Sequence, residues 1–192
     1  MIQMIEIPLI IQIFVLLNPL SSVPFLMSAY RKKLDVRRIA FLSVVTAFAI
    51  ALIISMIGPK LFDFFGITVN SFRIAGGIVL LLLGIDTIRP KEKEVSTHTG
   101  VHSMISIIAT PMLTGPATIS FITIKAYEMA QFTLLTNLVL AFILVGVVFV
   151  TFVYLIPRIN ENLISISSRV LGLFLTAVAI EMIATGAKGL WG

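Results

Sequence analysis

Long apolar segments dominate this chain of 192 residues and leave few folds open to it. Six runs, each about as long as a bilayer crossing requires, are separated by charged or turn-rich breaks at residues 7–29, 39–58, 69–88, 101–124, 133–156 and 166–187. The composition is 58 % hydrophobic and 12 % charged, which is more apolar surface than one soluble core can bury. We therefore exclude a water-soluble domain and predict a single transmembrane domain over residues 1–192.

The apolar runs predict helices rather than the strands of a membrane β-barrel. Barrel strands are runs of about ten residues in which apolar and polar side chains alternate. The runs from Val79 to Leu83 and from Leu138 to Val150 do not alternate. The predicted fold class is therefore an all-α membrane protein with six transmembrane helices.

The distribution of lysine and arginine predicts the orientation in the membrane. Five of the fourteen basic residues lie in one loop, and more follow the third and fifth runs: Arg31, Lys32, Lys33, Arg37, Arg38, then Arg89, Lys91, Lys93, then Arg158. The opposite side has only Lys60, Lys125 and Lys188 in its loops. The positive-inside rule then places both termini outside the cytoplasm and residues 89–100 in a flexible cytoplasmic linker. The basic charge thus indicates topology rather than nucleic-acid binding, and no nucleic-acid partner is expected.

Two halves of the chain repeat one pattern. The segment from Asn18 to Pro24 (NPLSSVP) matches the segment from Thr110 to Pro116 (TPMLTGP), with a polar residue, a proline and a second proline five residues later. The third run opens with Arg73-Ile-Ala-Gly and the sixth with Arg169-Val-Leu-Gly, and acidic Asp86 and Glu181 follow at similar spacing. Each half has three runs, an odd number, so residues 5–90 and 100–190 predict two three-helix repeats of inverted topology.

The paired prolines predict that helices 1 and 4 are broken near the bilayer midplane. Proline has no backbone N–H, so each pair removes two helical hydrogen bonds. Irregular backbone at membrane depth is tolerated only where it packs in protein or lines a wet cavity. We therefore expect the two breaks to face each other and to form a substrate site. The candidate binding residues are Asn18, Pro19, Leu20, Ser21, Ser22, Pro24, Thr110, Pro111, Leu113, Thr114, Gly115 and Pro116.

These residue types suit a small zwitterion. Half-helix N-termini and the hydroxyls of Ser21, Ser22 and Thr114 can donate to a carboxylate. The side-chain oxygens of Asn18 and Thr110, with the carbonyls freed by the prolines, can accept from an ammonium. No charged side chain lies near either break, which argues against a substrate of strong net charge because a buried unpaired ion is costly.

At these residues the sequence resembles the MarC family of prokaryotic inner-membrane proteins, which includes the SnatA-type small neutral amino acid transporters. The likeness covers essentially the whole chain and is carried by Leu17-Asn-Pro-Leu with Pro24, Phe72-Arg-Ile-Ala-Gly-Gly-Ile, Pro111 with Gly115-Pro116, and Arg169 with Gly172. The resemblance implies six spans in repeated halves, a cytoplasmic (inner) membrane location and, for some members, transport of glycine and alanine. Thr110 stands where the first half has Asn18, so the two half-sites cannot be identical.

Three ionisable residues are candidates for coupling or gating: Glu181, Arg73 and Arg169. Glu181 lies about 9 Å inside the end of the sixth run, deep enough to carry a coupling proton; pairing with Lys188 or hydration at the outer mouth is the alternative. The two arginines open equivalent runs, where snorkelling or capping competes with gating. His98 and His102 have a metal-compatible spacing, but no cysteine or nearby carboxylate completes a set, so no metal site and no cofactor is predicted.

The sequence thus predicts a secondary transporter of small neutral amino acids that works by alternating access, with a proton or sodium ion as the coupling partner. The chain has no GxxxxGK[ST] segment for ATP. An exporter of another small solute, a channel, or a structural partner of another membrane protein are the alternatives. An intramembrane enzyme is disfavoured because no histidine lies deep within any run. Transport direction and oligomeric state, a homo-oligomer included, stay open.

Overall fold

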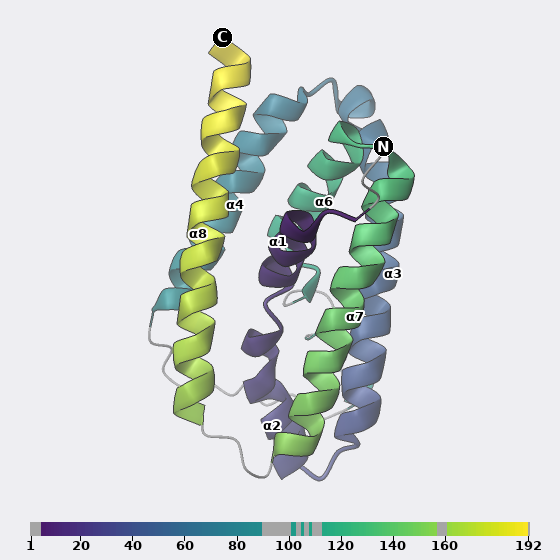
Figure 1. Cartoon of the computed structure of the whole chain (residues 1–192), viewed down its shortest axis with the longest axis vertical. Helices are drawn as coiled ribbons and strands as arrows, with labels where there is room; N and C mark the ends of the chain where they lie inside the picture. Colours follow the sequence, from purple (N-terminus) through teal and green to yellow (C-terminus); the bar gives the residue numbers. More distant parts are fainter. Residues whose placement is uncertain are drawn as a thin grey trace.

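The computed structural model describes residues 5–89, 101–102, 105, 108, 113–156 and 161–191, and within these ranges all regular structure is helical. The elements, in chain order, are α1 (Ile7–Leu17), the 3₁₀ turn η1 (Pro19–Ser22), α2 (Val23–Arg31), α3 (Val36–Phe65), α4 (Val69–Ile88), α6 (Pro116–Glu128), α7 (Gln131–Leu155) and α8 (Glu161–Trp191). The long helices run side by side along one axis, and both termini lie toward the same end (Figure 1). The all-α fold class is confirmed for the described residues.

Five segments are long and apolar enough to cross a membrane: Ile7–Arg31, Val36–Phe65, Val69–Ile88, Gln131–Leu155 and Leu163–Trp191. They correspond to five of the six predicted spans. The fourth predicted span, residues 101–124, is described mainly in its second half, which forms α6. The linker 89–100 and the motif residues Thr110 and Pro111 lie outside the described residues, apart from Arg89.

Two predicted spans are shorter than the observed helices. The sequence predicts residues 166–187 for the last one, where α8 covers Glu161–Trp191, and it ends the second one about two turns early. The sequence predicts that the second run ends at residue 58, before Pro59, but α3 continues through Pro59 to Phe65. Proline removes one helical hydrogen bond, yet packing can keep the following turn in place. Phe62 is buried and its ring contacts Phe72 and Tyr127, with centroid distances of 5.1 and 5.6 Å. These ring contacts account for the extra turns.

Small side chains allow the helices to approach closely. Along α3, the buried positions include a stripe at helical spacing: Ser43, Ala47, Ala51, Ser55 and Gly58. This helix contacts α6 and α7. In lipid, where helix association depends on close packing rather than on exclusion of water, such stripes mark the contact faces.

The most extensive contact in the described chain joins α4 to α8. An added Cβ at Gly84 would lie 3.1 Å from the carbonyl oxygen of Gly172, and one at Gly172 would lie 3.1 Å from that of Gly84. Gly77 faces Ile183 and Gly186 faces Ile74. Residues early in α4 thus face residues late in α8, and Gly84, late in α4, faces Gly172, early in α8. The two helices are therefore antiparallel.

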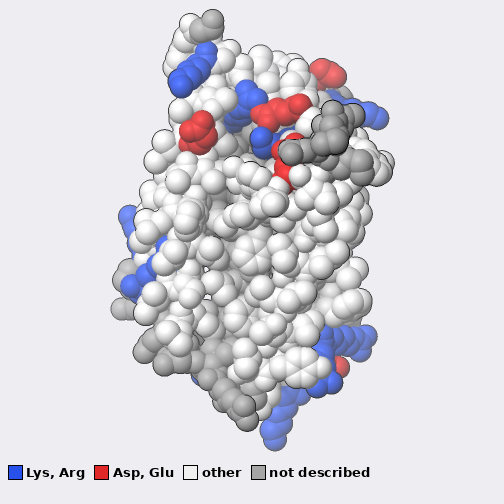
Figure 2. Space-filling view, viewed as in Figure 1, with Lys and Arg blue, Asp and Glu red and all other residues white. Residues whose placement is uncertain are grey.

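Charged side chains gather toward the two ends of the molecule. Figure 2 shows a broad central surface without them, apart from basic side chains at its left edge, while both signs occur at the upper end and a basic cluster lies at the lower right. Large apolar side chains on the outside include Phe41, Leu82 and Leu173, each more than half exposed. An apolar belt between charged ends fits an integral membrane protein.

Candidate functional site

The first span is interrupted at Asn18. Its backbone has φ 39° and ψ 61°, the left-handed conformation, and its N–H donates to the carbonyl oxygens of Phe14 and Val15 at 3.2 and 3.1 Å. Pro19 disfavours the helical conformation in the residue before it. Asparagine tolerates the left-handed region better than most residues. The Asn18-Pro19 pair therefore ends α1 after Leu17.

The chain resumes as a single 3₁₀ turn before α2 begins at Val23. The N–H and the hydroxyl of Ser21 both donate to the carbonyl oxygen of Asn18, at 3.1 and 2.8 Å. These bonds satisfy one of the acceptors that the break would otherwise leave open. The interruption is thus a defined turn and not a loss of order.

Three buried side-chain oxygens have no hydrogen-bond partner among the described residues: Asn18 Oδ1 and Ser22 Oγ at the interruption, and Ser43 Oγ on α3. Their residues are 3 %, 0 % and 0 % exposed. Buried side-chain amides are usually hydrogen-bonded, and Asn137 is an example. Its Oδ1 accepts from the N–H of Glu6 and its Nδ2 donates to the carbonyl of Thr133, both at 2.8 Å. An unpartnered buried polar group costs about 1–3 kcal/mol, so such a group calls for a polar ligand or a water molecule.

The interruption lies inside the helix bundle. The turn η1 contacts α7 and α8, and α1 contacts α6, α7 and α8. From the second half, Leu113, Thr114 and Gly115 are buried, with Leu113 and Thr114 at 0 % and 1 % exposure. Among the other predicted site residues, Pro19 is buried, Leu20 and Ser21 are half-buried, and Pro24 and Pro116 are exposed. Most described members of the predicted site therefore point into protein.

The start of α6 supplies backbone donors. Gly115 is the N-cap residue, with φ −70° and ψ 174°, and Pro116 takes the first helical position, where its missing N–H is not needed. The N–H of Ile119 donates to the Gly115 carbonyl at 3.0 Å. The N–H groups of Ala117 and Thr118, which immediately precede Ile119, have no acceptor within the helix and carry partial positive charge.

Two surface hollows lie elsewhere. One is lined by Ile11, Phe14, Leu144, Val147 and Val148, and the other by residues of α3 and α7 between Arg37 and Tyr154. Neither contains Asn18, Ser22 or Ser43, and both have apolar walls. The three oxygens are themselves buried in this conformation.

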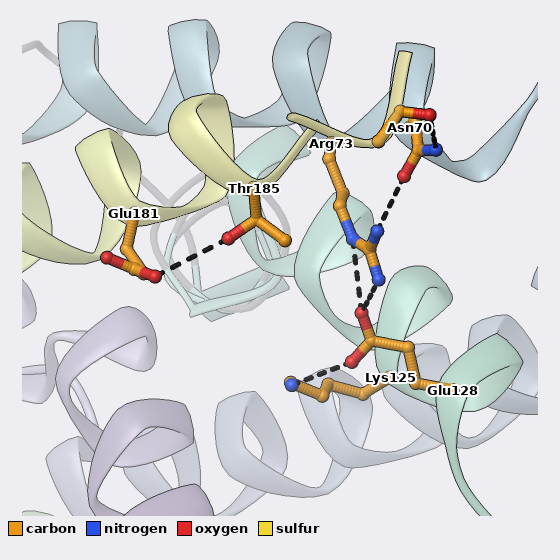
Figure 3. Close-up of polar contacts among 7 residues, drawn as sticks. Asn70, Arg73, Lys125, Glu128, Glu181 and Thr185 are labelled. Atoms are coloured by element: carbon orange, nitrogen blue, oxygen red, sulfur yellow. Dashed lines mark hydrogen bonds and ion pairs between the residues drawn. The ribbon is translucent and has the colours of Figure 1, made fainter. Parts of the chain in front are cut away.

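A second polar group lies at the end of the molecule that carries both termini. Arg73 of α4 forms an ion pair with Glu128 at the end of α6; its Nε lies 3.1 Å from Glu128 Oε1. Lys125 Nζ donates to Glu128 Oε2 at 2.8 Å, and Asn70 Oδ1 accepts from Arg73 at 2.6 Å (Figure 3). Asn70 also donates to the carbonyl oxygen of Gly189 at 2.8 Å. The cluster thus joins α4, α6 and α8.

Glu128 lies beyond residue 124, where the fourth predicted span ends. Its partial burial would raise the pKa of the carboxyl group, but hydrogen bonds from Lys125 and Arg73, together with the positive charges of those residues, outweigh this effect. The pKa of Glu128 is therefore below its ordinary value. Glu128 thus holds its proton less readily than an ordinary glutamate, which favours the ionised form that pairs with Arg73.

The other two gating candidates are placed differently. Glu181 is an exposed residue of α8, and Thr185 Oγ1 donates to its carboxylate at 3.4 Å (Figure 3). Arg169 is exposed near the start of α8, and within the described residues it makes no ion pair. Arg73 is thus the one of the three that the described structure engages in a salt bridge.

The structure adds residues that the sequence patterns did not single out. Ser43 lies in an apolar run with Thr46 and Ser55. A serine or threonine in such a run usually bonds to its own helix backbone, so only the unpartnered burial of Ser43 identifies it. Three other residues lie at the ends of predicted spans, where polar side chains are common: Lys125 and Glu128 follow the fourth span, and Asn70 lies at the start of the third. A comparison of the charged residues that follow the two proline pairs could have found Glu128, because an acidic residue also follows the first pair at Asp35.

Comparisons with known proteins cover nearly the whole chain. The family model described as MarC family integral membrane protein matches residues 4–191. UPF0056 membrane protein MJ1677 from Methanocaldococcus jannaschii is 33 % identical over 191 residues, which is 92 % of this chain and 93 % of that protein. UPF0056 membrane protein YhcE from Escherichia coli is 29 % identical, over 94 % of this chain and 91 % of its own. UPF0056 membrane protein PYRAB13050 from Pyrococcus abyssi is 26 % identical, over 96 % of this chain and 94 % of that protein. No solved structure matches the chain.

Proposed function

Because the chain belongs to the MarC family of integral membrane proteins, we propose that it is a secondary transporter of small neutral amino acids such as glycine and alanine. The substrate binds at the broken first and fourth spans, and the two halves move to expose it to either side of the membrane in turn. The observation that carries this proposal is the group of unpartnered buried oxygens on Asn18, Ser22 and Ser43.

The chemistry of those oxygens favours a zwitterion. Asn18 Oδ1 can accept a hydrogen bond from an ammonium, while the two serine hydroxyls can donate to a carboxylate or accept from the ammonium. The N–H groups at the start of α6 add partial positive charge for the carboxylate. The first span has no ionisable residue between residues 7 and 29, so a net-neutral substrate costs least to desolvate.

The packing of the helices supports two inverted repeats. In such repeats α4 corresponds to α8, and α3 corresponds to α7. The first span then corresponds to the fourth, which contains α6. Equivalent helices of opposite topology run antiparallel, as α4 and α8 do. The contact of α2 with α3 has its counterpart in the contact of α6 with α7. This arrangement would bring two broken helices together at the centre of the bundle.

We further propose that the protein lies in the cytoplasmic membrane with both termini outside the cytoplasm, and that a proton or sodium gradient drives transport. The basic loop between α2 and α3 would then face the cytoplasm. Exposed Glu181 is the candidate carrier of a coupling proton. Transport requires no bond to be made or broken, so no residue has a catalytic role.

Counterflow into proteoliposomes tests the proposal whatever the direction of transport or the coupling ion. Vesicles loaded with unlabelled glycine are diluted into labelled glycine, and exchange is measured. We expect accumulation of label in vesicles containing the protein. We expect at least a tenfold loss with Asn18→Gly, since glycine keeps the left-handed backbone and removes the side chain that carries the oxygen.

Ser55→Ala serves as the matched control, because Ser55 is a buried serine of α3 whose hydroxyl donates to the Leu52 carbonyl at 2.8 Å. It should exchange glycine like the native protein. No accumulation above empty vesicles, for glycine and for alanine, would rule out the proposed substrate class. Equal exchange by Asn18→Gly and the native protein would rule out the site. Unitary conductance in electrical recordings would instead identify a channel.

A further inference from the structure

The two ends of the bundle are packed differently. At the end carrying the termini, α4 lies close against α6, so that an added Cβ at Gly76 would be only 2.6 Å from Ser120 Cβ. The corresponding helices at the opposite end are α2 and α8, since α2 follows the first proline pair as α6 follows the second. Within the described chain, α8 contacts α1 and η1 but has no comparable contact with α2. One end is closed and its counterpart is not.

The ionic cluster that holds the closed end has a second copy in the sequence. Lys125-Ala-Tyr-Glu128 follows the second broken segment, and Lys32-Lys-Leu-Asp35 follows the first at nearly the same spacing. Arg169 is the counterpart of Arg73, because each precedes a glycine by three positions at the start of equivalent helices. The repeat therefore pairs Arg73 and Glu128 at one end with Arg169 and Asp35 at the other.

Only the first of these pairs is made. Arg73 and Glu128 form a salt bridge with side chains 18 % and 25 % exposed. Asp35 instead caps α3, accepting from the N–H of Arg38 at 3.1 Å, and is exposed. Arg169 is exposed too, and in the described part of the chain it is not paired with Asp35.

We propose that Arg73–Glu128 and Arg169–Asp35 are two ionic gates that form in alternation, one at each end of the transport path. In the conformation described here the gate beside the termini is shut and the other is unmade. When α8 and α2 approach, Arg169 reaches Asp35 and the Arg73–Glu128 pair separates. This inference deepens the proposed transport function and rests on it.

Weak ion pairs suit a gate that must form and separate in each transport cycle. A partly exposed ion pair shifts a two-state population only about two- to fivefold, so either gate can bias the equilibrium without locking it. A pair that was fully buried would be much harder to separate, because each charge would be left without compensation. The partial exposure of both Arg73 and Glu128 therefore agrees with a contact that is made and broken in each cycle.

Cross-linking tests the alternation directly, because the chain contains no native cysteine. The cysteines replace residues next to the gates, so that the ion pairs themselves stay intact: one reporter carries Phe72→Cys with Tyr127→Cys, and the other carries Leu34→Cys with Ser168→Cys. A short bifunctional maleimide is the probe, since residues joined through long side chains are too far apart at Cα for a disulfide. We expect efficient cross-linking of the first reporter in proteoliposomes and slow cross-linking of the second.

Loss of one gate should favour the other. Adding Arg73→Gln to the second reporter is expected to raise its cross-linking rate about two- to fivefold. The charge-exchanged pair Arg73→Glu with Glu128→Arg should return that rate to its starting value, which also shows that the helices still fold. Lys188→Gln is the matched control, because it removes an exposed positive charge of α8 from the same end and should leave the rate unchanged.

Three results would overturn the inference: no cross-linking of the first reporter, equal rates in the Arg73→Gln and Lys188→Gln backgrounds, or no recovery on charge exchange. None of these measurements uses an amino acid substrate. A protein that fails in glycine counterflow but shows the reciprocal cross-linking would keep its gates and lose only the proposed substrate. Counterflow without reciprocal cross-linking would keep the transport function and reject the gates.

Discussion

At the scale of single residues, this protein places polar atoms where they cost stability. Ser22 and Ser55 are both serines at 0 % exposure in membrane-spanning segments. The hydroxyl of Ser55 has partners, donating to Leu52 and lying 3.4 Å from Gln131 Nε2, whereas that of Ser22 has none among the described residues. A stability cost without a structural gain is expected at functional positions.

The two serines should therefore respond oppositely to removal of the hydroxyl. We expect Ser22→Ala to leave the unfolding free energy unchanged or raise it by about 1 kcal/mol, because an unsatisfied buried group is removed. Ser55→Ala should lower it by about 0.5–1.5 kcal/mol. Thermal unfolding of the detergent-solubilised proteins measures both. If Ser22→Ala destabilises as much as Ser55→Ala, the hydroxyl of Ser22 has a structural partner and is not kept free for a ligand.

The lowered pKa of Glu128 gives a stability effect with a definite sign. A carboxyl whose pKa is lower in the folded than in the unfolded protein stabilises the fold fully above the unfolded value, about 4.3, and loses that contribution as pH falls through the folded value. Glu128→Gln should then be less stable than the native protein at neutral pH, by at most about 1 kcal/mol. The difference should vanish at strongly acidic pH.

Unfolding temperatures of the native protein and Glu128→Gln, compared from neutral to acidic pH, measure that difference. Asp35→Asn is a useful comparison because Asp35 is an exposed carboxylate that caps α3. A deficit of Glu128→Gln that persisted unchanged at the acidic end would mean that the ion pair is not its source.

At the scale of the elements, the α4–α8 pair depends on glycine. The reciprocal approach of Gly84 and Gly172 brings each Cα close to the carbonyl oxygen of the other residue. Backbone atoms cannot move aside as a flexible side chain can, so even one methyl group must push the helices apart. Gly146 of α7, by contrast, would direct an added Cβ into space with nothing within 4 Å.

Gly84→Ala should accordingly lower the unfolding free energy by about 1–3 kcal/mol through overpacking. Gly146→Ala should be neutral or should stabilise the protein by up to about 1 kcal/mol, because alanine favours the helix over glycine. Thermal unfolding of the two variants in the same detergent measures both changes in unfolding free energy. Equal effects of the two substitutions would show that the α4–α8 contact is looser than described.

At the scale of the whole molecule, the bundle combines two similar sequence segments, NPLSSVP and TPMLTGP, with ends that are packed differently. The closed end carries the Arg73–Glu128 pair and both termini (Figure 1). If the termini lie outside the cytoplasm, the Arg73–Glu128 pair lies on the outer side of the membrane and the unmade Arg169–Asp35 pair lies on the cytoplasmic side. The orientation in the membrane therefore decides which half of the transport cycle is seen.

Labelling of single cysteines checks that orientation. Lys188→Cys lies at the end with the termini and Arg38→Cys lies beside the basic loop, and both positions are exposed. In intact cells a membrane-impermeant maleimide should label Lys188→Cys and should label Arg38→Cys only after the cells are permeabilised. The reverse pattern would place the shut gate on the cytoplasmic side.

The sequence alone determined the all-α membrane class and the approximate positions of the described spans, because hydrophobicity sets a span. The Asn18-Pro19 pair disfavours the helix locally, and α1 ends beside it at Leu17. The end of α3 is misplaced because Pro59 acts locally as a helix breaker, while distant ring contacts with Phe72 and Tyr127 keep the helix going.

Tertiary structure alone decided which polar residues matter. Ser43 and Ser55 are both serines in one apolar helix, and only packing leaves the first without a partner and the second with two. The pairing of Arg73 with Glu128, rather than an equal pairing at both ends, is likewise a property of one conformation. A repeated sequence encodes both gates equally, and the relative positions of the helices determine which one is closed, because an ion pair depends on distance and not on the identity of its residues alone.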